Sequence, residues 1–272
     1  MLKRIDRLSR IHPQAPAPDP DPDPDTDTEY DRGMDTDAIG SFETEPLLPE
    51  VLPAEPFGLF LEWFEQAQHA GEVPNPNAMT LATVDPDGKP SARIVLCKAV
   101  EPARGAIVWY SNYRSRKGLA LEANPRAAAV FHWDKAERQV RVEGVVFKTS
   151  TQESDAYFAS RAWESRVGAW ASHQSQPIES RQALMEQVAQ TIIDQNIDIA
   201  AAVRGDPVEI PRPPFWGGYR LVVLRIELWA GSTGRIHDRA VWEREYRAAD
   251  ADISSGVNPS MVSPWKATRL AP

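Results

Sequence analysis

Hydrophobic and polar positions along the chain predict an ordered body that begins near residue 56 and is rich in β-strands. In PFGLFLEWFEQAQHAG (56–71), apolar residues recur at helical spacing, and Gly71 suits the end of a helix. Two β-rich runs within 78–100 flank Asp85-Pro86-Asp87-Gly88, which predicts a hairpin. Further runs with strand character follow at 106–112, 127–133, 138–150, 215–231 and 237–245.

Helices are predicted between these strands. The segment 115–125 stops at Asn124-Pro125, 150–161 begins with a capping pattern, and 180–195 is amphipathic. Because the strands come mostly as hairpins, a mainly β fold of the antiparallel barrel type with interspersed helices is favoured over a doubly wound parallel sheet. The chain contains neither GxGxxG nor GxxxxGK[ST], so an anionic ligand would have to be held by side chains.

The first part of the chain differs in composition from the rest. PAPDPDPDPDTDTEYD (16–31) is of low complexity, and we interpret residues 1–45 as a disordered tail before a single domain at 46–272. Residues 1–38 hold five basic and ten acidic side chains, so they carry −5 of the net charge of −9. The remaining body is only mildly acidic, which argues against a general nucleic-acid surface.

Cysteine usage and hydropathy narrow the class of protein further. Cys97 is the single cysteine, which excludes a disulfide within the chain and argues against a cysteine-based zinc site. No apolar stretch approaches the length of a membrane span, and MLKRIDRLSRIH lacks the apolar centre of a secretory signal. We therefore expect a cytoplasmic protein without membrane, nucleic-acid or metal partners.

Three basic stretches are candidates for binding anions. Arg93 and Lys98 lie five apart on a predicted strand, which points them to opposite faces, where they contact different ligands or water. The segment 110–117 joins a strand to a helix start and carries hydroxyls and adjacent bases, a pattern that suits a phosphate as well as a solvated loop. Tyr157, Arg161 and Ser165 share one face of a continuing helix, as a second phosphate site or as an amphipathic surface.

Other polar residues could meet a flat ring. Gln139 lies inside a strand and Gln174-Ser175 in a polar loop, although most glutamines are simply exposed. Near the C-terminal end, GRIHDR (234–239) alternates Arg235, His237 and Arg239, and an extended segment would place all three on one face around an anion. Trp229 precedes this segment and borders either a planar ligand or the core.

Taken together and in order, these stretches resemble the pyridoxamine 5′-phosphate oxidase family. The resemblance covers roughly residues 56–272. It rests on RIVLCK (93–98), YSNYRSRK (110–117), ERQVRVEG (137–144), YFASRAWESRVGAW (157–170), SHQSQPI (172–178), FWGGYR (215–220), IELWAG (226–231), RIHDR (235–239) and RLAP (269–272). It implies an FMN-binding split β-barrel, antiparallel and Greek-key-like, that forms an obligate homodimer with FMN at the subunit interface.

The resemblance also implies an activity and a set of site residues. FMN would oxidise pyridoxamine or pyridoxine 5′-phosphate to pyridoxal 5′-phosphate, and O2 would be reduced to hydrogen peroxide. The implied FMN contacts are Arg93, Ile94, Val95, Lys98, Tyr110, Ser111, Arg116, Lys117, Gln139, Gln174, Ser175, Trp229 and Arg239. The implied substrate contacts are Lys98, Tyr157, Arg161, Ser165, Arg235 and His237, of which Arg235 and His237 would be catalytic.

The sequence departs from the family pattern at three places. Asp27 stands where an Arg-x-x-Tyr motif would have its arginine, with Tyr30 at the tyrosine; Asn75 replaces a frequent acidic residue, and 198–214 is longer than usual. Two other functions stay open: an FMN oxidase of the phenazine type, and a non-catalytic carrier of flavin or pyridoxal phosphate. The vitamin B6 substrate is favoured over the phenazine type because the chain retains Tyr157, Arg161, Ser165, Arg235 and His237.

Overall fold

A computed structural model of the protein describes residues 47–71, 73–246 and 262–272. The interpretation of residues 1–45 as a tail, and the departure at Asp27, lie outside these residues. The strands are β1 (Ala78–Val84), β2 (Pro90–Leu96), β3 (Ala99–Glu101), β4 (Ala106–Asn112), β5 (Arg126–Trp133), β6 (Arg138–Lys148), β7 (Trp216–Ala230), β8 (Asp238–Glu243) and β9 (Lys266–Leu270). The helices are α2 (Phe57–Ala70), α3 (Arg116–Ala123), α4 (Thr151–Ala159), α5 (Trp163–Ala171), α6 (Arg181–Asp194) and α7 (Ile199–Arg204).

All of the strand pairings in the described sheet are antiparallel, as the sequence predicted. The order is β2-β1-β5-β6-β7-β4-β3, and β8 pairs with β7 and β9 with β8. The sheet is not closed, since no ladder of the described residues pairs its two ends, β2 and β3. These two strands are consecutive in the chain. Cys97 donates to the Asn77 carbonyl on one side, and Lys98 donates to the Val108 carbonyl on the other. The chain itself therefore bridges the split between the ends.

Strand β7 is the longest in the sheet and changes its inward face midway. It pairs with β6 along one edge, whereas its other edge pairs first with β4 and then with β8. Before Leu224, odd-numbered residues such as Leu221 and Val223 reach the main core, and after it even-numbered ones such as Ile226 do. The switch comes from a β-bulge opposite Gly144, where an added Cβ would lie 1.9 Å from the Val222 carbonyl oxygen.

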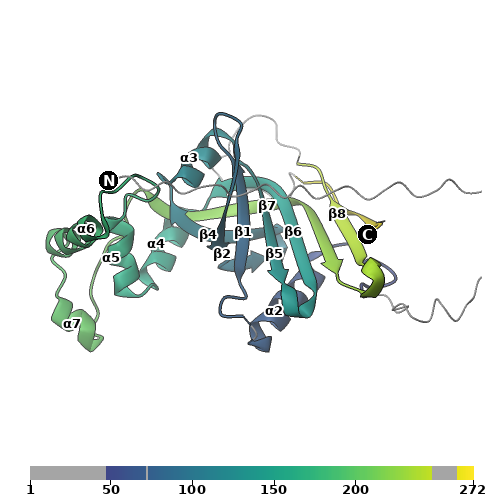
Figure 1. The fold of residues 1–272 in the computed structure, drawn as a ribbon, viewed down its shortest axis with the longest axis horizontal. Helices are drawn as coiled ribbons and strands as arrows, with labels where there is room; N and C mark the ends of the chain where they lie inside the picture. Colours follow the sequence, from purple (N-terminus) through teal and green to yellow (C-terminus); the bar gives the residue numbers. More distant parts are fainter. Residues whose placement is uncertain (1–46, 72, 247–261) are drawn as a thin grey trace, which may run out of the picture. The chain divides into compact units, whose positions relative to one another are not determined.

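Helix α2 covers the core, and the other long helices gather elsewhere. Phe57, Phe60 and Phe64 of α2 are buried, and the last two pack against Phe131, which confirms that these aromatics are core residues. Gly71 ends the helix in the left-handed conformation. Helices α4 to α7 lie at one end of the sheet, and β8 lies towards the opposite end (Figure 1). In the described part, no helix is long and apolar enough to cross a membrane.

The region between β6 and β7 corrects one expectation. The predicted helix through Tyr157 and Ser165 is wrong, because α4 ends at Ala159 and α5 starts at Trp163. The Ser160 hydroxyl donates to the Tyr157 carbonyl at 2.8 Å, which satisfies a carbonyl of the last turn. The predicted capping pattern is confirmed as a full capping box between Ser150 and Glu153. The long segment 198–214 contains the short helix α7.

Candidate active site

A cavity of about 970 Å³ opens where the split of the sheet meets α3, α4 and α5. Strand β2 supplies one wall, the end of β4 and the start of α3 supply the floor, and α4, α5 and the following loop supply the far side. Its lining includes the following predicted site residues: Arg93, Ile94, Val95, Lys98, Tyr110, Ser111, Arg116, Lys117, Tyr157, Arg161, Ser165, Gln174 and Ser175. Most of the residues implied by the resemblance thus come together in one place.

The charge of this lining is of one sign. Five basic side chains face the cavity, and no aspartate or glutamate is among the lining residues of the described chain: Arg93, Lys98, Arg116, Lys117 and Arg161. Like charges that share a site raise its energy unless a counter-ion is bound. The arrangement therefore suits an anion such as a phosphate ester.

Lys117 is the most buried of these bases. The Ser115 hydroxyl, which also caps α3, and the Gln174 Oε1 atom accept from its ammonium group at 2.9 and 2.7 Å. An ammonium group has three donors, so one donor remains beyond these two acceptors. Burial, and then the charge of Arg93, lower the pKa of Lys117 to about 8.

Arg161 lies on the opposite side of the cavity, between α4 and α5. Its guanidinium lies 4.6 Å from the centroid of the Trp216 ring and 5.6 Å from that of Phe158. Its Nη1 atom is buried and has no hydrogen-bond partner among the described residues. Burial lowers the pKa of Arg161, so this cation is held in an unfavourable environment that a bound anion would relieve.

Aromatic rings form a stack beside Arg161. Tyr110 and Tyr157 are stacked with their ring centroids 3.7 Å apart, and Trp216 lies nearly parallel to both. The stacked rings come from β4, α4 and the start of β7, so they hold these three elements together along one side of the cavity. Burial, and then the charge of Glu153, raise the pKa of the Tyr110 hydroxyl, which keeps it a neutral donor.

The prediction about Arg93 and Lys98 needs correction. Arg93 and Lys98 do not face apart: both line the cavity, because β2 ends at Leu96 and the chain turns before Lys98. Arg93 donates to the Leu81 carbonyl and to the hydroxyls of Thr83 and Ser91 at 2.6–3.2 Å, so it is fixed without a carboxylate.

Arg116 has an acidic partner that the sequence analysis missed. Its Nε atom donates to the Asp85 carboxylate at 2.9 Å, which raises the pKa of Arg116. Asp85 belongs to the predicted hairpin turn, and its other oxygen is buried without a partner. In the sequence, its place in the turn accounts for this aspartate, and no local pattern indicates that it lies next to the bases of α3.

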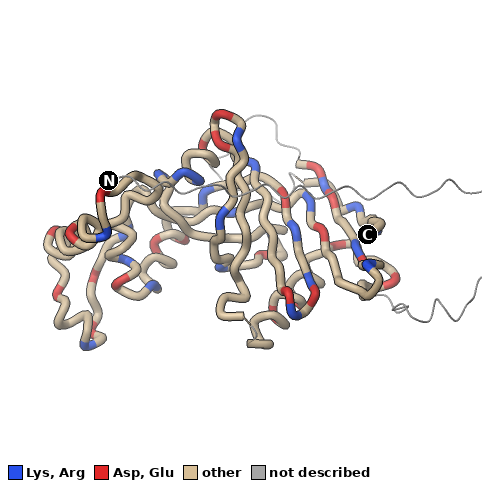
Figure 2. The backbone as a smooth tube through the Cα atoms, in the orientation of Figure 1, with Lys and Arg blue, Asp and Glu red and all other residues tan. Residues whose placement is uncertain are grey.

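The remaining predicted flavin contacts form a second group, away from the cavity. Gln139, Trp229 and Arg239 are register partners across β6, β7 and β8, so they share one face of the sheet. Basic and acidic positions are interspersed along the strands of this region (Figure 2). The ring of His237 lies 4.7 Å from that of Trp229, which adds a fourth predicted residue to this group.

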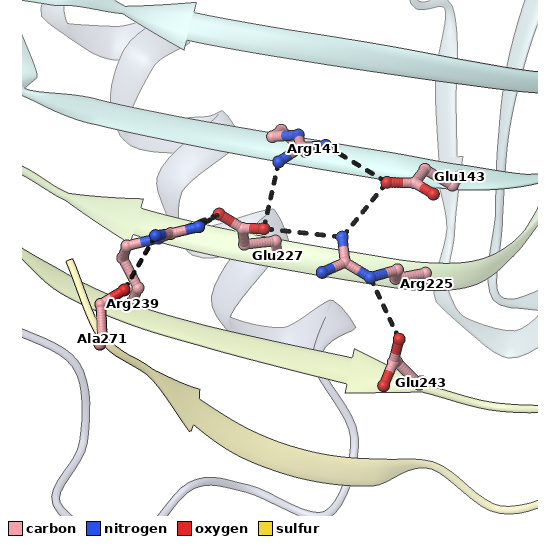
Figure 3. A network of polar contacts seen from close by, with 7 residues as sticks. All are labelled: Arg141, Glu143, Arg225, Glu227, Arg239, Glu243 and Ala271. Atoms are coloured by element: carbon pink, nitrogen blue, oxygen red, sulfur yellow. Dashed lines mark hydrogen bonds and ion pairs between the residues drawn. The ribbon is translucent and has the colours of Figure 1, made fainter.

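A carboxylate at the centre of this face explains why its arginines can lie close together. Glu227 is 2% exposed and bonds or pairs with Arg141, Arg225 and Arg239 at 2.8–3.5 Å (Figure 3). Arg239 also donates to the Ala271 carbonyl at 2.9 Å. The prediction that an external anion must hold Arg239 among other bases is therefore incomplete, since Glu227 supplies that charge from within the chain.

The GRIHDR segment is not extended, which corrects its predicted alternation. Gly234 and Arg235 have φ of 63° and 62°, and the Ile236 N–H bonds to the Thr233 carbonyl, so these residues form a tight turn. Arg235 is exposed, and β8 starts only at Asp238. Asp238, another residue missed from sequence, accepts from the Leu48 N–H and from Arg269 at 2.8 and 2.5 Å.

The cavity and the second group lie towards opposite ends of β7. Trp216 lines the cavity and Trp229 belongs to the second group, and the rise of a strand separates them by up to roughly 40 Å. Neither Gln139, Trp229 nor Arg239 lines the cavity of the described chain, and the same holds for Arg235 and His237. A single chain therefore does not bring all of the predicted site residues together.

Comparison with known proteins assigns the family. Residues 66–193 match the family model described as pyridoxamine 5′-phosphate oxidase, and residues 216–272 match the pyridoxine 5′-phosphate oxidase C-terminal dimerisation region. A pyridoxine/pyridoxamine 5′-phosphate oxidase of Paraburkholderia xenovorans is 52% identical over 199 residues, covering 73% of this chain and 87% of the relative. One of Burkholderia mallei is 51% identical over 217 residues, covering 80% and 89%.

Solved structures agree on the fold. PhzG from Burkholderia lata, solved with tetrahydrophenazine-1-carboxylic acid, has a TM-score of 0.65 at 28% identity and covers 81% of this chain and 94% of its own. A pyridoxamine 5′-phosphate oxidase-related, FMN-binding protein from Nostoc punctiforme has a TM-score of 0.56 at 15% identity, covering 82% and 99%. The class is thus the split-barrel fold of flavin-binding proteins. Within it, the chain belongs to the pyridoxine/pyridoxamine 5′-phosphate oxidase family, which confirms the resemblance.

Proposed function

We propose that this protein is an FMN-dependent oxidase that converts pyridoxamine 5′-phosphate and pyridoxine 5′-phosphate to pyridoxal 5′-phosphate, with O2 as electron acceptor. Membership of an oxidase family points to a flavin cofactor and supports this class of reaction. The observation that carries the proposal is the one-sided charge of the cavity, in which Lys117 and Arg161 are held without a carboxylate partner. Both FMN and the substrate bring a phosphate group that would supply the missing negative charge.

The two phosphates are assigned to opposite sides of the cavity. Arg93, Arg116 and Lys117, together with Ser111, Gln174 and Ser175, suit the FMN phosphate and its chain, because Lys117 has a spare donor beside the start of α3. Tyr157, Arg161 and Ser165 suit the substrate phosphate, and Lys98 borders both. The unpartnered Nη1 of Arg161 is the donor that this phosphate would satisfy.

The complete site is proposed to form between two protomers. A matching dimerisation region at 216–272 supports a homodimer. In it, the 229–239 segment and Gln139 of one protomer would meet the cavity of the other. Gln139, Trp229 and Arg239 would then contact the flavin, and Arg235 and His237 the substrate.

When bound, FMN would supply the acceptor for the hydride of the aminomethyl or hydroxymethyl carbon and pass the electrons to O2; the alcohol would give the aldehyde directly, and water would hydrolyse the imine formed from the amine to the aldehyde and ammonia. The chain's own contribution would be orientation and electrostatics. The phosphate ligands fix one end of the substrate, and Arg235, projecting from its turn, would position the reacting carbon. No side chain on this surface is assigned as a general base.

The test uses the purified full-length protein supplied with FMN in air. On addition of pyridoxine 5′-phosphate, we expect pyridoxal 5′-phosphate absorbance and hydrogen peroxide to rise together in equal amounts. Formation of both would also show that Asp27 is tolerated in the place of the family's arginine. A protein that binds FMN but leaves both B6 phosphates unchanged would overturn the substrate assignment.

A second candidate function is oxidation of a phenazine-type precursor. The similarity to PhzG, solved with tetrahydrophenazine-1-carboxylic acid, favours testing this class. Such a ligand carries a carboxylate in place of the phosphate. The same assay with a dihydro- or tetrahydrophenazine carboxylate would separate the two functions, and turnover of that substrate alone would support the second. A protein that binds FMN or pyridoxal phosphate and turns over neither substrate would be a carrier.

A further inference from the structure

The turn that presents Arg235 has an unfavourable backbone conformation. Gly234 and Arg235 both have positive φ, as the two central residues of a type I′ turn require. Glycine adopts this conformation readily, whereas a residue with a Cβ and a long side chain does so at a cost. Such a conformation persists only where neighbouring groups enforce it.

The group that spans this turn is the ring of His237. The Ser232 N–H donates to His237 Nδ1 at 3.1 Å, so a side-chain hydrogen bond joins the residue before the turn to the residue after it. The inner bond from Ile236 to Thr233 is long, at 3.3 Å. Trp229 supports the other side of the imidazole ring, with 4.7 Å between the ring centroids.

We infer that His237 is a positioning residue for Arg235, in addition to any contact it makes with substrate. Nδ1 acts as the acceptor that closes the segment 232–237 and holds Arg235 in its left-handed conformation. Because Nδ1 accepts a hydrogen bond, the neutral ring carries its proton on Nε2, which leaves Nε2 as a donor towards the ligand. The consequence for catalysis rests on the proposed function, whereas the state of the turn does not.

Substitution of His237 by asparagine or glutamine tests the roles of the two ring nitrogens, Nδ1 and Nε2, separately. The amide oxygen of H237N can replace Nδ1 as an acceptor for the Ser232 N–H. The longer side chain of H237Q places its amide near the position of Nε2, and H237A supplies neither. The measurement is residue-resolved hydrogen–deuterium exchange of the Ser232 amide in full-length protein, with the Leu228 amide in the β6–β7 ladder as an internal reference for folding.

We expect Ser232 exchange to be about tenfold faster in H237A and H237Q, and close to the wild-type rate in H237N. If oxidase activity is present, kcat should fall further in H237Q than in H237N, because only the former releases Arg235. A Ser232 amide that exchanges equally slowly in wild type and H237A would overturn the inference. So would H237N exchanging as fast as H237A.

The ring itself gives a second readout, which needs no substrate. The ¹⁵N spectrum of His237 in mildly alkaline buffer should show a protonated Nε2 and an unprotonated Nδ1. The opposite tautomer would overturn the assignment of Nδ1 as acceptor. Absence of oxidase activity in the wild type would refute the proposed function alone, since neither exchange nor tautomer depends on turnover.

Discussion

The arginines on the β6–β8 face have neighbours of the opposite kind to those of Arg93 and Arg161 in the cavity. On the face, Arg141, Arg225 and Arg239 surround the buried carboxylate of Glu227, and Glu143 and Glu243 add further pairs (Figure 3). In the cavity, Arg93 is held by hydroxyls and a carbonyl, and Arg161 by aromatic rings. Among the described residues, neither has an acidic side chain as a hydrogen-bonding partner.

The difference teaches how structural cations can be distinguished from binding cations. A cation that is neutralised within its own chain contributes to the folded state and has little charge left for a ligand. A partly buried cation without a carboxylate costs stability until an anion arrives. Arg239 belongs to the first kind although it is a predicted flavin contact, because Glu227 neutralises it on the face that is proposed to meet the flavin of the other protomer.

The largest expected effect comes from removing the carboxylate at the centre of the face. In Glu227→Ala, three arginines lose their shared partner, and the free energy of unfolding should fall by about 3 kcal/mol. Urea unfolding of the protein without added FMN measures this change. Glu243→Ala is the matched control: it removes an exposed partner of Arg225, and the expected loss is below about 1 kcal/mol. Equal losses in the two variants would contradict a central role for Glu227.

Removing a cation from the cavity should have a smaller effect, and it should not lower the stability of the folded protein. Arg161→Met keeps an apolar contact with Trp216 and removes the guanidinium, so kcat/KM for pyridoxine 5′-phosphate should fall roughly a hundredfold. The thermal midpoint should stay the same or rise, because an unpartnered buried donor is lost. Arg204→Met, on α7 and paired with Asp206, is the control and should change neither quantity. A destabilised R161M with unchanged kcat/KM would reverse the comparison.

The smallest effect is a pH dependence of FMN binding. Lys117, with a pKa of about 8, loses its proton as pH rises through that value, and FMN affinity should fall by up to roughly tenfold per pH unit above it. Because the pKa is depressed by folding, the unfolded chain binds the proton more tightly. The ligand-free protein should therefore become more stable as pH rises from about 8 towards the ordinary lysine pKa. Fluorescence titration of FMN across this interval, repeated with Lys117→Met, should show the slope only in the wild type.

Local patterns were sufficient for most of the elements, whereas the members of the cavity were predicted through the resemblance to the family. The hairpin at Asp85–Gly88, the capping box at Ser150 and the end of α2 at Gly71 depend on neighbours in sequence, and all were predicted. The family resemblance assigned Arg93, Lys117 and Gln174 to one site, because the motifs that contain them occur in this chain in the same order as in the family.

What sequence could not supply were partners distant in the chain and the ends of regular structure. Glu227 looked like one polar position in an apolar strand, and only the pairing of β6, β7 and β8 gives it three arginines. The break between α4 and α5 follows a serine that also fits within a helix. The left-handed conformation of Arg235 departs from the period-two pattern, since the hydrogen bond from the Ser232 backbone N–H to the His237 side chain decides the local conformation.

Because of the bulge opposite Gly144, the residues of β7 that face the core are odd-numbered before Leu224 and even-numbered after it. Loss of Leu224 would restore a regular ladder and leave every side chain from Ile226 to Ala230 on its present side, because Glu143 would still pair with Arg225 and Val142 with Ile226. Loss of Ile226 would instead keep the bulge, and Glu227 and Trp229 would then turn into the core while Leu228 would turn out. The chain can therefore change in length at 198–214, where it forms α7 outside the sheet, whereas β7 can lose a single residue only at the bulge.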